Sequence, residues 1–196
     1  MALPNLAVEA DLSTRGVTPE FPGLADVMLA VASSVVRGAA GSPILETTST
    51  VTLWGLDRSQ WLDLPGHPVT AVSAVTHDGE TLAVGDYKLA NGRLWGSSQW
   101  GNGCEPLEVV VAMTHGLTEV PAHVIQLVCD LAIAGMSAAA DGARNPNVIA
   151  EKIDDYAVTF APGAEAVASA VELPKLTKAW LRSQFGGGGV GMVTHR

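Results

Sequence analysis

The sequence predicts an α+β fold, mainly a helical bundle with an inserted antiparallel β region. Helices are expected near residues 24–40, 120–140 and 173–185, because apolar residues recur there at helical spacing. The β region is expected over residues 44–116, where short β-branched runs are separated by turns that contain glycine and proline. Because this region lies between the first two helices along the chain, we expect it to be an insertion into the helical frame.

Length and charge limit the possible functions. The chain has 196 residues, of which 47% are hydrophobic, and this is enough for the core of one domain. Residues 1–173 contain twenty acidic and seven basic residues, a formal charge of −13, whereas the last 23 residues contain four basic residues and no acidic one. Nucleic-acid binding depends mainly on basic residues that neutralise phosphates, so an acidic body argues against it.

No segment predicts secretion or membrane insertion. At the N-terminus, no basic region precedes an apolar one, so we expect no secretion signal. The most apolar stretch, Val120–Ala140, contains Gln126 and Asp130, and we do not expect it to span a membrane. The two cysteines, Cys104 and Cys129, form no CxxC pair and fit a reduced cytosolic setting.

Before the β region, the chain predicts a short helix and a long one. The short candidate is Val8–Thr14, which ends at Gly16. In Leu24–Ala40, apolar residues line one side and polar residues the opposite stripe, which predicts a core helix. The run Gly41-Ser42-Pro43 marks its end.

Within the β region, two strands and two tight turns are the clearest local predictions. Ile44–Trp54 is rich in threonine and other β-branched residues and predicts a strand. Val69–His77 predicts a second strand, whose odd-numbered residues share one face. Asp78-Gly79 and Asn91-Gly92 are typical of two-residue hairpin turns.

Four of the five tryptophans lie in the β region, at positions 54, 61, 95 and 100. Exposed rings could stack on sugars, as in a carbohydrate-binding or host-attachment module. The other interpretation is that these rings fill a small β core or lie at an interface. We favour the second interpretation, because aromatic residues supply large buried areas to cores and interfaces.

The long helix expected at Val120–Ala140 is apolar over most of its circumference. Its polar residues form a single narrow stripe. Such a helix must be covered on most sides, which one small domain can barely do, so we expect a contact between subunits. The residues expected to pack between subunits are Val124, Val128, Leu131, Ile133 and Met136.

The C-terminal part predicts a strand, a linker, a helix and a tail. Val148–Phe160 ends in an alternating strand, and Ala161–Val171 is expected to be a small-residue linker. Leu173–Phe185 predicts a short basic helix. Four consecutive glycines follow it, so we expect one domain over residues 1–185 and a flexible glycine-rich tail over residues 186–196.

No catalytic or metal-binding motif is apparent. The chain lacks GxxxxGK[ST] and GxSxG. Its five histidines are scattered, and His115 and His123 do not form the i, i+4 pair of a helical metal site. Asp154-Asp155 has no nucleophile or base nearby in the sequence, so a solvated turn is the better interpretation. We therefore predict no catalytic, cofactor-binding or metal site and no enzymatic activity.

Three segments follow one another in an order that is more specific than any one of them. They are WLDLPGHPVTAVSAVTHDG (residues 61–79, with YKL and GRLW after it), HGLTEVPAHVIQLVCDLA (His115–Ala132), and EKIDDYAVTFA (Glu151–Ala161) before a terminal leucine/aromatic helix. Together with that helix they are distributed over residues 24–185. In this order, the chain resembles the head–tail connector (head-completion adaptor) proteins of tailed bacteriophages.

The resemblance implies a structural virion protein without catalysis or cofactor. It implies a homo-oligomeric ring, commonly of twelve copies, that docks beneath the portal protein at the capsid vertex. Such a ring extends the DNA channel and is the platform for stopper and tail proteins. The expected locations are the virion neck and, during assembly, the host cytoplasm. DNA passes through such a channel without specific binding, which an acidic body suits.

In this family, the helical part packs against ring neighbours and the C-terminal segment reaches into the portal. For this chain, the resemblance implies portal contacts at Trp180, Arg182, Phe185, Val190, Met192, Val193 and Arg196. A glycine hinge followed by apolar residues also suits a segment that becomes ordered on docking. The alternatives are another neck or tail-completion component of the same assembly, or the carbohydrate-binding module named above.

Overall fold

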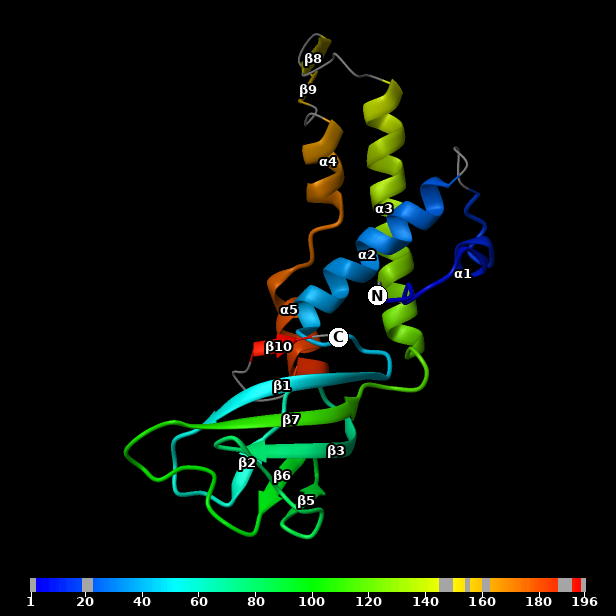
Figure 1. Cartoon of the computed structure of the whole chain (residues 1–196). Helices are drawn as coiled ribbons and strands as arrows, with labels where there is room; N and C mark the ends of the chain where they lie inside the picture. Colours follow the sequence, from blue (N-terminus) through cyan, green and yellow to red (C-terminus); the bar gives the residue numbers. More distant parts are fainter. Residues whose placement is uncertain are drawn as a thin grey trace. The chain divides into compact units, whose positions relative to one another are not determined.

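Figure 1 shows the computed structural model of the chain, which describes residues 3–18, 23–144, 150–153, 156–159, 163–186 and 192–194. The chain forms two compact units. One, here called the β unit, comprises residues 1–3, 37–119 and 176–196. The other, here called the helical unit, comprises residues 4–36 and 120–175.

The β unit is built on a five-stranded antiparallel sheet with the strand order β10-β1-β7-β3-β4. Its strands are β1 (Thr47–Gly55), β3 (Val69–His77), β4 (Glu80–Thr81), β7 (Leu107–His115) and β10 (Met192–Thr194). β1 and β7 pair along their whole length, from Thr47 opposite His115 to Gly55 opposite Leu107. In both strands every second residue is buried from the third onward, as expected when one face of a sheet lies on a core.

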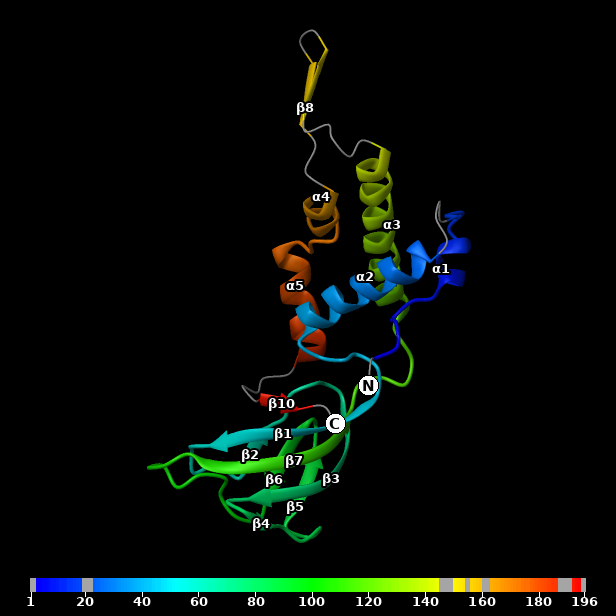
Figure 2. The same cartoon turned by 45° about the horizontal axis from the view of Figure 1, so that its top comes forward.

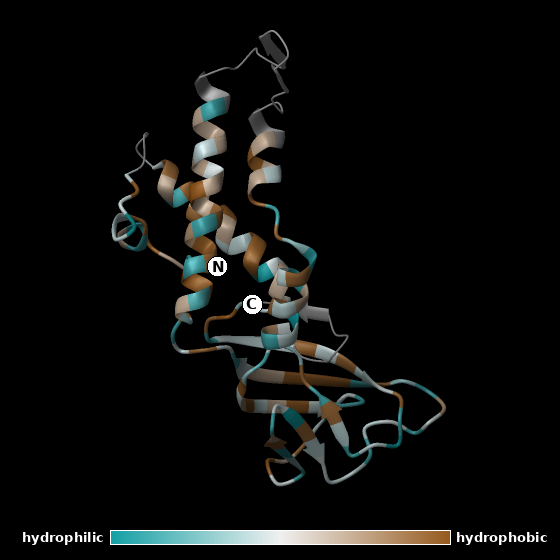
Figure 3. Ribbon diagram, turned by 180° about the vertical axis from the view of Figure 1, so that it is seen from behind, coloured by the Kyte–Doolittle hydropathy of each residue, from teal (hydrophilic) through white to brown (hydrophobic). Residues whose placement is uncertain are grey.

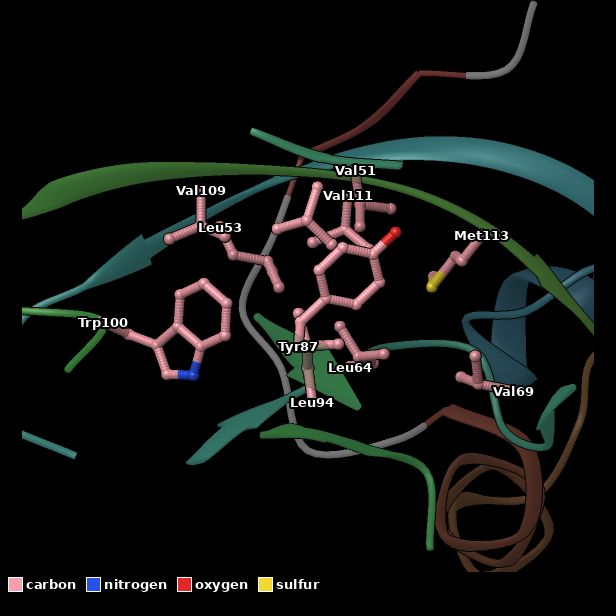
Figure 4. Close-up of a cluster of buried hydrophobic side chains, with 11 residues drawn as sticks. Val51, Leu53, Leu64, Val69, Tyr87, Leu94, Trp100, Val109, Val111 and Met113 are labelled. Carbon is pink, nitrogen blue, oxygen red and sulfur yellow. The ribbon is translucent and has the colours of Figure 1, made fainter. Parts of the chain in front are cut away.

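A second antiparallel sheet shares one hydrophobic core with the first. Its strands are β2 (Trp61–Asp63), β5 (Tyr87–Ala90) and β6 (Arg93–Gly96), in the order β2-β6-β5. Figure 4 shows the Tyr87 ring of β5 among Val111, Leu64 and Leu94 in this core. The buried members are Val51, Leu53, Leu64, Val69, Val75, Tyr87, Leu94, Trp100, Val109, Val111 and Met113. Burial of these large side chains is the main force that holds the two sheets together.

Both predicted hairpin turns are confirmed. Asp78 and Gly79 have φ values of 49° and 83°, and they join β3 to β4 with His77 opposite Glu80. Asn91 and Gly92 have φ values of 52° and 73° and join β5 to β6 in the same way. Two successive residues with positive φ define the turn whose twist matches that of the flanking strands, and glycine and asparagine adopt it most readily.

The predicted alternation along β3 is wrong. Its pairing with β7 shifts register between Val69 and Ala71 and again between Val72 and Ala74. Each such bulge inserts an extra residue and turns the following side chains to the other face. The buried or half-buried apolar positions are therefore Val69, Val72 and Val75, whereas Ala71 and Ser73 are exposed.

The helical unit contains three packed helices and a short one. They are α1 (Glu9–Ser13), α2 (Leu24–Ala40, of which the residues from Arg37 onward belong to the β unit), α3 (Ala122–Arg144) and α4 (Gly163–Ala170). The hairpin of β8 (Ala150–Ile153) and β9 (Tyr156–Thr159) lies between α3 and α4 in sequence. Figure 1 and Figure 2 both show α3 beside α4.

Small residues allow these helices to approach closely. A Cβ atom added to Gly135 of α3 would lie 3.0 Å from Met28 Sδ of α2 and 3.1 Å from Val171 Cγ1, just after α4. The N-terminal segment is held by polar contacts. Arg15 Nη1 lies 2.8 Å from Asp130 Oδ1 of α3, and the backbone N–H of Leu6 donates to Ser33 Oγ of α2 at 2.9 Å.

In the β unit, the C-terminal helix α5 (Lys175–Leu181) continues into a π-helical turn, η1 (Arg182–Gly186). The Leu181 and Phe185 side chains are buried. The backbone N–H of Gly66 donates to the Gly186 carbonyl at 3.1 Å, and a Cβ on Gly186 would lie 2.8 Å from the Ala40 carbonyl oxygen. Gly186, the first residue of the predicted tail, is thus held by the fold.

Two of the larger predictions need correction. The structure is α+β with about 38% helix and 27% strand, so the prediction of a mainly helical bundle is wrong. The region predicted as an insertion, residues 44–116, supplies the core between the two sheets and forms most of the β unit, which also includes residues 176–196. The predicted linker over residues 161–171 is also wrong over most of its length, because it contains α4, and alanine is the strongest helix former.

Candidate interaction surfaces

Helix α3 is the longest helix and is strongly apolar. Figure 3 shows apolar residues through most of its turns, interrupted by a few hydrophilic positions. Its segment Ala122–Asp141 is long and apolar enough to cross a membrane by length and composition alone, and 39% of its most apolar window is buried within the protein. A core helix passes the same test, so this single helix is weak evidence for a membrane span.

Most of the residues predicted to pack between subunits are buried within the chain itself. Val124 and Val128 are fully buried, and Leu131 and Met136 are 8% and 7% exposed. A side chain covered by its own chain has no surface left for a neighbouring subunit. Of the five predicted residues, only Ile133 is half-buried.

The apolar side chains of α3 that remain partly uncovered are mostly not the ones predicted to contact another subunit. Ile125 and Leu127 of α3 are half-buried, as is Ile133. On α2, Val27 is 56% exposed. The predicted polar stripe of α3 is exposed at His123, Gln126, Asp130 and Ser137. Half-covered apolar side chains, rather than the fully buried ones, are available to a partner of the helical unit.

Helix α5 presents an exposed apolar face. Leu176 is 86% exposed and Trp180 is 41% exposed, and their i, i+4 spacing places them on one side of the helix. Arg182, in the following turn, is also exposed. Of the residues predicted to bind a portal, Trp180 and Arg182 are therefore accessible, whereas Phe185 is only 5% exposed and belongs to the fold. Leu176 was not among the predicted contacts, although its i, i+4 spacing from Trp180 in the sequence indicates that both lie on the same side of the helix.

The last described residues form an edge strand. In β10, Met192 lies opposite Thr52, Val193 opposite Val51, and Thr194 opposite Thr50. These three residues cover one third of the outer edge of β1, which has nine residues. Predicted contacts Met192 and Val193 thus belong to the sheet through their backbone. Val190 and Arg196, and the tail residues 187–191 and 195–196, lie outside the described residues.

The tryptophans of the β region divide between core and surface. Trp100 is 2% exposed, and its indole N–H donates to the Gln60 carbonyl at 2.9 Å. Trp95 is half-buried. Trp54 and Trp61 are 58% and 42% exposed. Trp100 thus fills the β core, as the favoured interpretation predicts, whereas Trp54 and Trp61 leave ring surface exposed.

Trp54 and Trp61 line a cleft of about 360 Å³ in the β unit, here called the tryptophan cleft. Its walls come from the end of β1, the β1–β2 loop, β2, Arg93 of β6 and the loop that carries Trp100. Asp63 pairs with Arg93, whose guanidinium lies 5.7 Å from the centre of the Trp61 ring. No single segment of the sequence contains this group, because three strands and two loops bring it together.

Three of the four described histidines, His67, His77 and His115, lie against other parts of the β unit. His115 is buried, with Nε2 2.6 Å from Ser49 Oγ on the neighbouring strand. His77 Nε2 lies 3.2 Å from the Trp100 carbonyl oxygen, and its ring meets the indole edge-on. His67 packs so closely against Gly92 that a Cβ there would lie 2.3 Å from its Cε1.

Within the described ranges, no three histidine, cysteine or acidic side chains gather where they could hold a metal ion. Asp154-Asp155 and His195 lie outside the described residues. The two cysteines differ: Cys104 is exposed, whereas Cys129 of α3 is buried. Burial raises the pKa of the Cys129 thiol above its ordinary value, Asp11 and Asp130 add to this rise, and Arg15 opposes it.

No protein-family model matches the chain, and no curated protein matches it in sequence.

Proposed function

We propose that this chain is a structural subunit of the head–tail connector of a tailed bacteriophage. Copies of the chain form a ring, with twelve copies as the expected number, beneath the portal protein at the capsid vertex. The ring extends the DNA channel, lets DNA pass without specific binding, and serves as a platform for stopper and tail proteins. It acts in the virion neck, after assembly in the host cytoplasm, and catalyses no reaction.

One observation carries this proposal beyond the resemblance. The apolar pair Leu176 and Trp180 is exposed on α5, in the C-terminal segment that the resemblance assigns to portal binding. Tryptophan is enriched among the residues that supply most of the energy of protein–protein contacts, and exposed apolar side chains gathered on one face mark interaction sites. Arg182, in the following turn, is exposed as well.

Two further features support the proposal, one for contacts between copies of the chain and one for the passage of DNA. The half-buried apolar side chains of α3 leave surface that a ring neighbour can cover. The charge of the chain is −9 overall, and its acidic residues all precede position 173. A ring lined by acidic side chains repels DNA, because both are negatively charged, and this suits a channel through which DNA must slide.

The binding proposal is tested with portal rings of the same phage. We expect the purified chain to bind these rings, and the double variant Leu176→Ser/Trp180→Ser to bind at least tenfold more weakly, because two exposed anchors are lost. Val84→Ser is the matched control, since Val84 is 82% exposed in a β-unit loop. Twelve weak contacts on one ring act together, so binding is measured both with single portal subunits and with assembled rings.

The proposal is wrong if the chain does not bind the portal rings, or if both the double variant and a chain truncated after Gly186 bind them as well as the unaltered chain. Circular dichroism spectra of each variant separate a lost contact from a lost fold.

A further inference from the structure

The tryptophan cleft carries a second inference, which does not rest on the proposed connector function. Its lining combines exposed indole rings with side chains of both charges. Trp54, Trp61, Asp57, Asp63 and Arg93 all contribute to it. A volume of about 360 Å³ lies at the lower end of the range for small-molecule sites in proteins.

The walls of the cleft are held by backbone contacts. Gly55 and Gly101 allow close approach of two loops: a Cβ on Gly55 would lie 2.1 Å from the Trp100 carbonyl oxygen, and one on Gly101 would lie 2.5 Å from the Leu56 carbonyl carbon. The backbone N–H of Trp100 donates to the Ser59 carbonyl at 2.9 Å, and that of Gly103 donates to the Leu56 carbonyl at 3.0 Å. The loop between β1 and β2 is thus fixed before any ligand binds, which lowers the entropic cost of binding.

The charged groups in the cleft are arranged as neighbouring donors and acceptors. Arg93 is oriented by its hydrogen bond to Asp63 and lies over the Trp61 ring. The Asp57 side chain is exposed, and within the described part of the chain no hydrogen bond or ion pair engages its carboxylate. A guanidinium offers only donors and a carboxylate only acceptors.

This combination selects the chemistry of the ligand. An anionic ligand would meet the carboxylates of Asp57 and Asp63, and a cationic one could pair with Asp57 but would leave the remaining donors of Arg93 without an acceptor. A hydroxyl group both donates and accepts a hydrogen bond, so a polyhydroxylated neutral molecule satisfies both kinds of group at once. The apolar C–H face of a sugar ring also packs on an indole face, and Trp54 and Trp61 supply two such rings.

We propose that the tryptophan cleft binds a neutral saccharide, which packs its ring on Trp61 or Trp54 and hydrogen-bonds to Asp57 and Arg93. The saccharide is small, in keeping with the volume of the cleft. The competing occupant is a segment of another protein, because tryptophan and arginine are also frequent anchors in protein interfaces.

The test is a glycan array of neutral mono-, di- and trisaccharides built from glucose, galactose, mannose and N-acetylglucosamine, probed with the full chain. The affinity of the chain for each sugar that binds it on the array is then measured by calorimetry. We expect Trp61→Ala to weaken binding about tenfold, through the lost ring contact, and Trp61→Phe to restore part of it. Asp57→Asn is expected to weaken binding about tenfold, because hydrogen bonds to charged groups are among the stronger ones.

Matched controls lie elsewhere on the same unit. Trp180→Ala removes another exposed tryptophan, and Glu80→Gln neutralises an exposed carboxylate of β4. Neither should change the affinity for the sugar. Binding of a neutral sugar should also hardly change between low and high salt, since no ion pair forms.

The inference is overturned if the chain binds no neutral sugar on the array, or if the cleft variants bind the sugar as tightly as the control variants do. It is equally overturned if a second array of charged glycans binds the chain and the neutral array does not, or if the cleft variants lose binding to the portal rings instead of to sugars. Failure here leaves the connector proposal standing, because Leu176→Ser/Trp180→Ser tests a different surface.

Discussion

The two units of this protein differ in how their interiors are filled. The core of the β unit consists of large side chains, such as Leu64, Tyr87 and Trp100, enclosed between two sheets. Among the described buried residues of the helical unit no side chain is aromatic, and leucines such as Leu12 and Leu29 pack beside small residues, among them Ala25, Ala32 and Ala132. Packing through small residues brings helix backbones close together, but it buries less apolar area per residue than a core of leucines and aromatic rings.

This difference indicates which unit depends more on partners. In the β unit, the core between the two sheets is closed, and the exposed large apolar side chains lie outside it, on α5 (Leu176 and Trp180), in the tryptophan cleft and in loops. The helical unit leaves Ile125, Leu127 and Ile133 of its longest helix half-covered. We therefore expect the β unit to be stable by itself and the helical unit to gain stability when further copies of the chain cover it.

The largest loss of stability is expected in the β unit, when a side chain fills the space beside Gly55. Gly55→Val places carbon atoms where the Trp100 carbonyl lies, 2.1 Å from the ideal Cβ position. We expect the free energy of unfolding to fall by about 3 kcal/mol or more, at the upper end for overpacking. All five tryptophans belong to the β unit, so denaturant titrations followed by tryptophan fluorescence measure this loss.

Gly85→Ala is the matched control for Gly55→Val, because nothing lies within 4 Å of a Cβ at that position. It should leave the fluorescence transition unchanged. An unaltered transition in Gly55→Val would contradict the close packing described for the two loops of the cleft.

The helical unit is expected to tolerate overpacking better. Gly135→Leu forces a side chain against Met28 and Val171, and methionine can shift because its side chain is flexible. We expect a loss of about 2 kcal/mol, smaller than that of Gly55→Val, measured by helical circular dichroism during thermal unfolding.

Gly38→Ala, in the end of α2 that belongs to the β unit, makes the opposite change. Nothing lies within 4 Å of its Cβ position, and replacing an exposed helical glycine by alanine should stabilise the helix by about 0.5 to 1 kcal/mol. If Gly135→Leu is as well tolerated as Gly38→Ala, the close contact of α3 with α2 is absent.

The smallest effect concerns the buried thiol of the helical unit. Burial raises the pKa of Cys129 above its ordinary value of 9.0. A group whose pKa is raised in the folded state stabilises that state fully below the ordinary pKa, and this contribution is lost as the pH rises through the raised value. We expect the stability of the helical unit to fall above about pH 9, and Cys129→Ala to remove this part of the pH dependence.

Cys104→Ser serves as the control for the thiol prediction, because Cys104 is exposed. Cys104 should react at once with a thiol reagent, and Cys129 only on unfolding. Equal pH dependence in Cys129→Ala and in the unaltered chain would show that the thiol makes no such contribution.

Local features were predictable from sequence, whereas long-range features were not. The hairpin turns at Asp78-Gly79 and Asn91-Gly92 were predictable because the turn depends on the two residues that form it. The bounds of α2 were predictable because helical periodicity and the glycine after it are local signals. The bulges of β3 depend on its pairing with β7, which is more than thirty residues away in the chain.

The candidate surfaces show the same division. The exposed face of α5 follows from the i, i+4 spacing of Leu176 and Trp180. Which side of α3 is covered depends on α1, α2 and α4, and the stripe predicted from periodicity alone is mostly buried. The tryptophan cleft combines Asp57, Asp63 and Arg93 from separate segments, and nothing local predicts that Arg93 lies over Trp61.

The most direct test of the connector proposal is electron microscopy of portal rings before and after addition of the purified chain. We expect an added annulus on one face of the portal ring, with the rotational symmetry of the portal, and no annulus with Leu176→Ser/Trp180→Ser. Portal rings that stay bare at saturating concentrations of a correctly folded chain would contradict it.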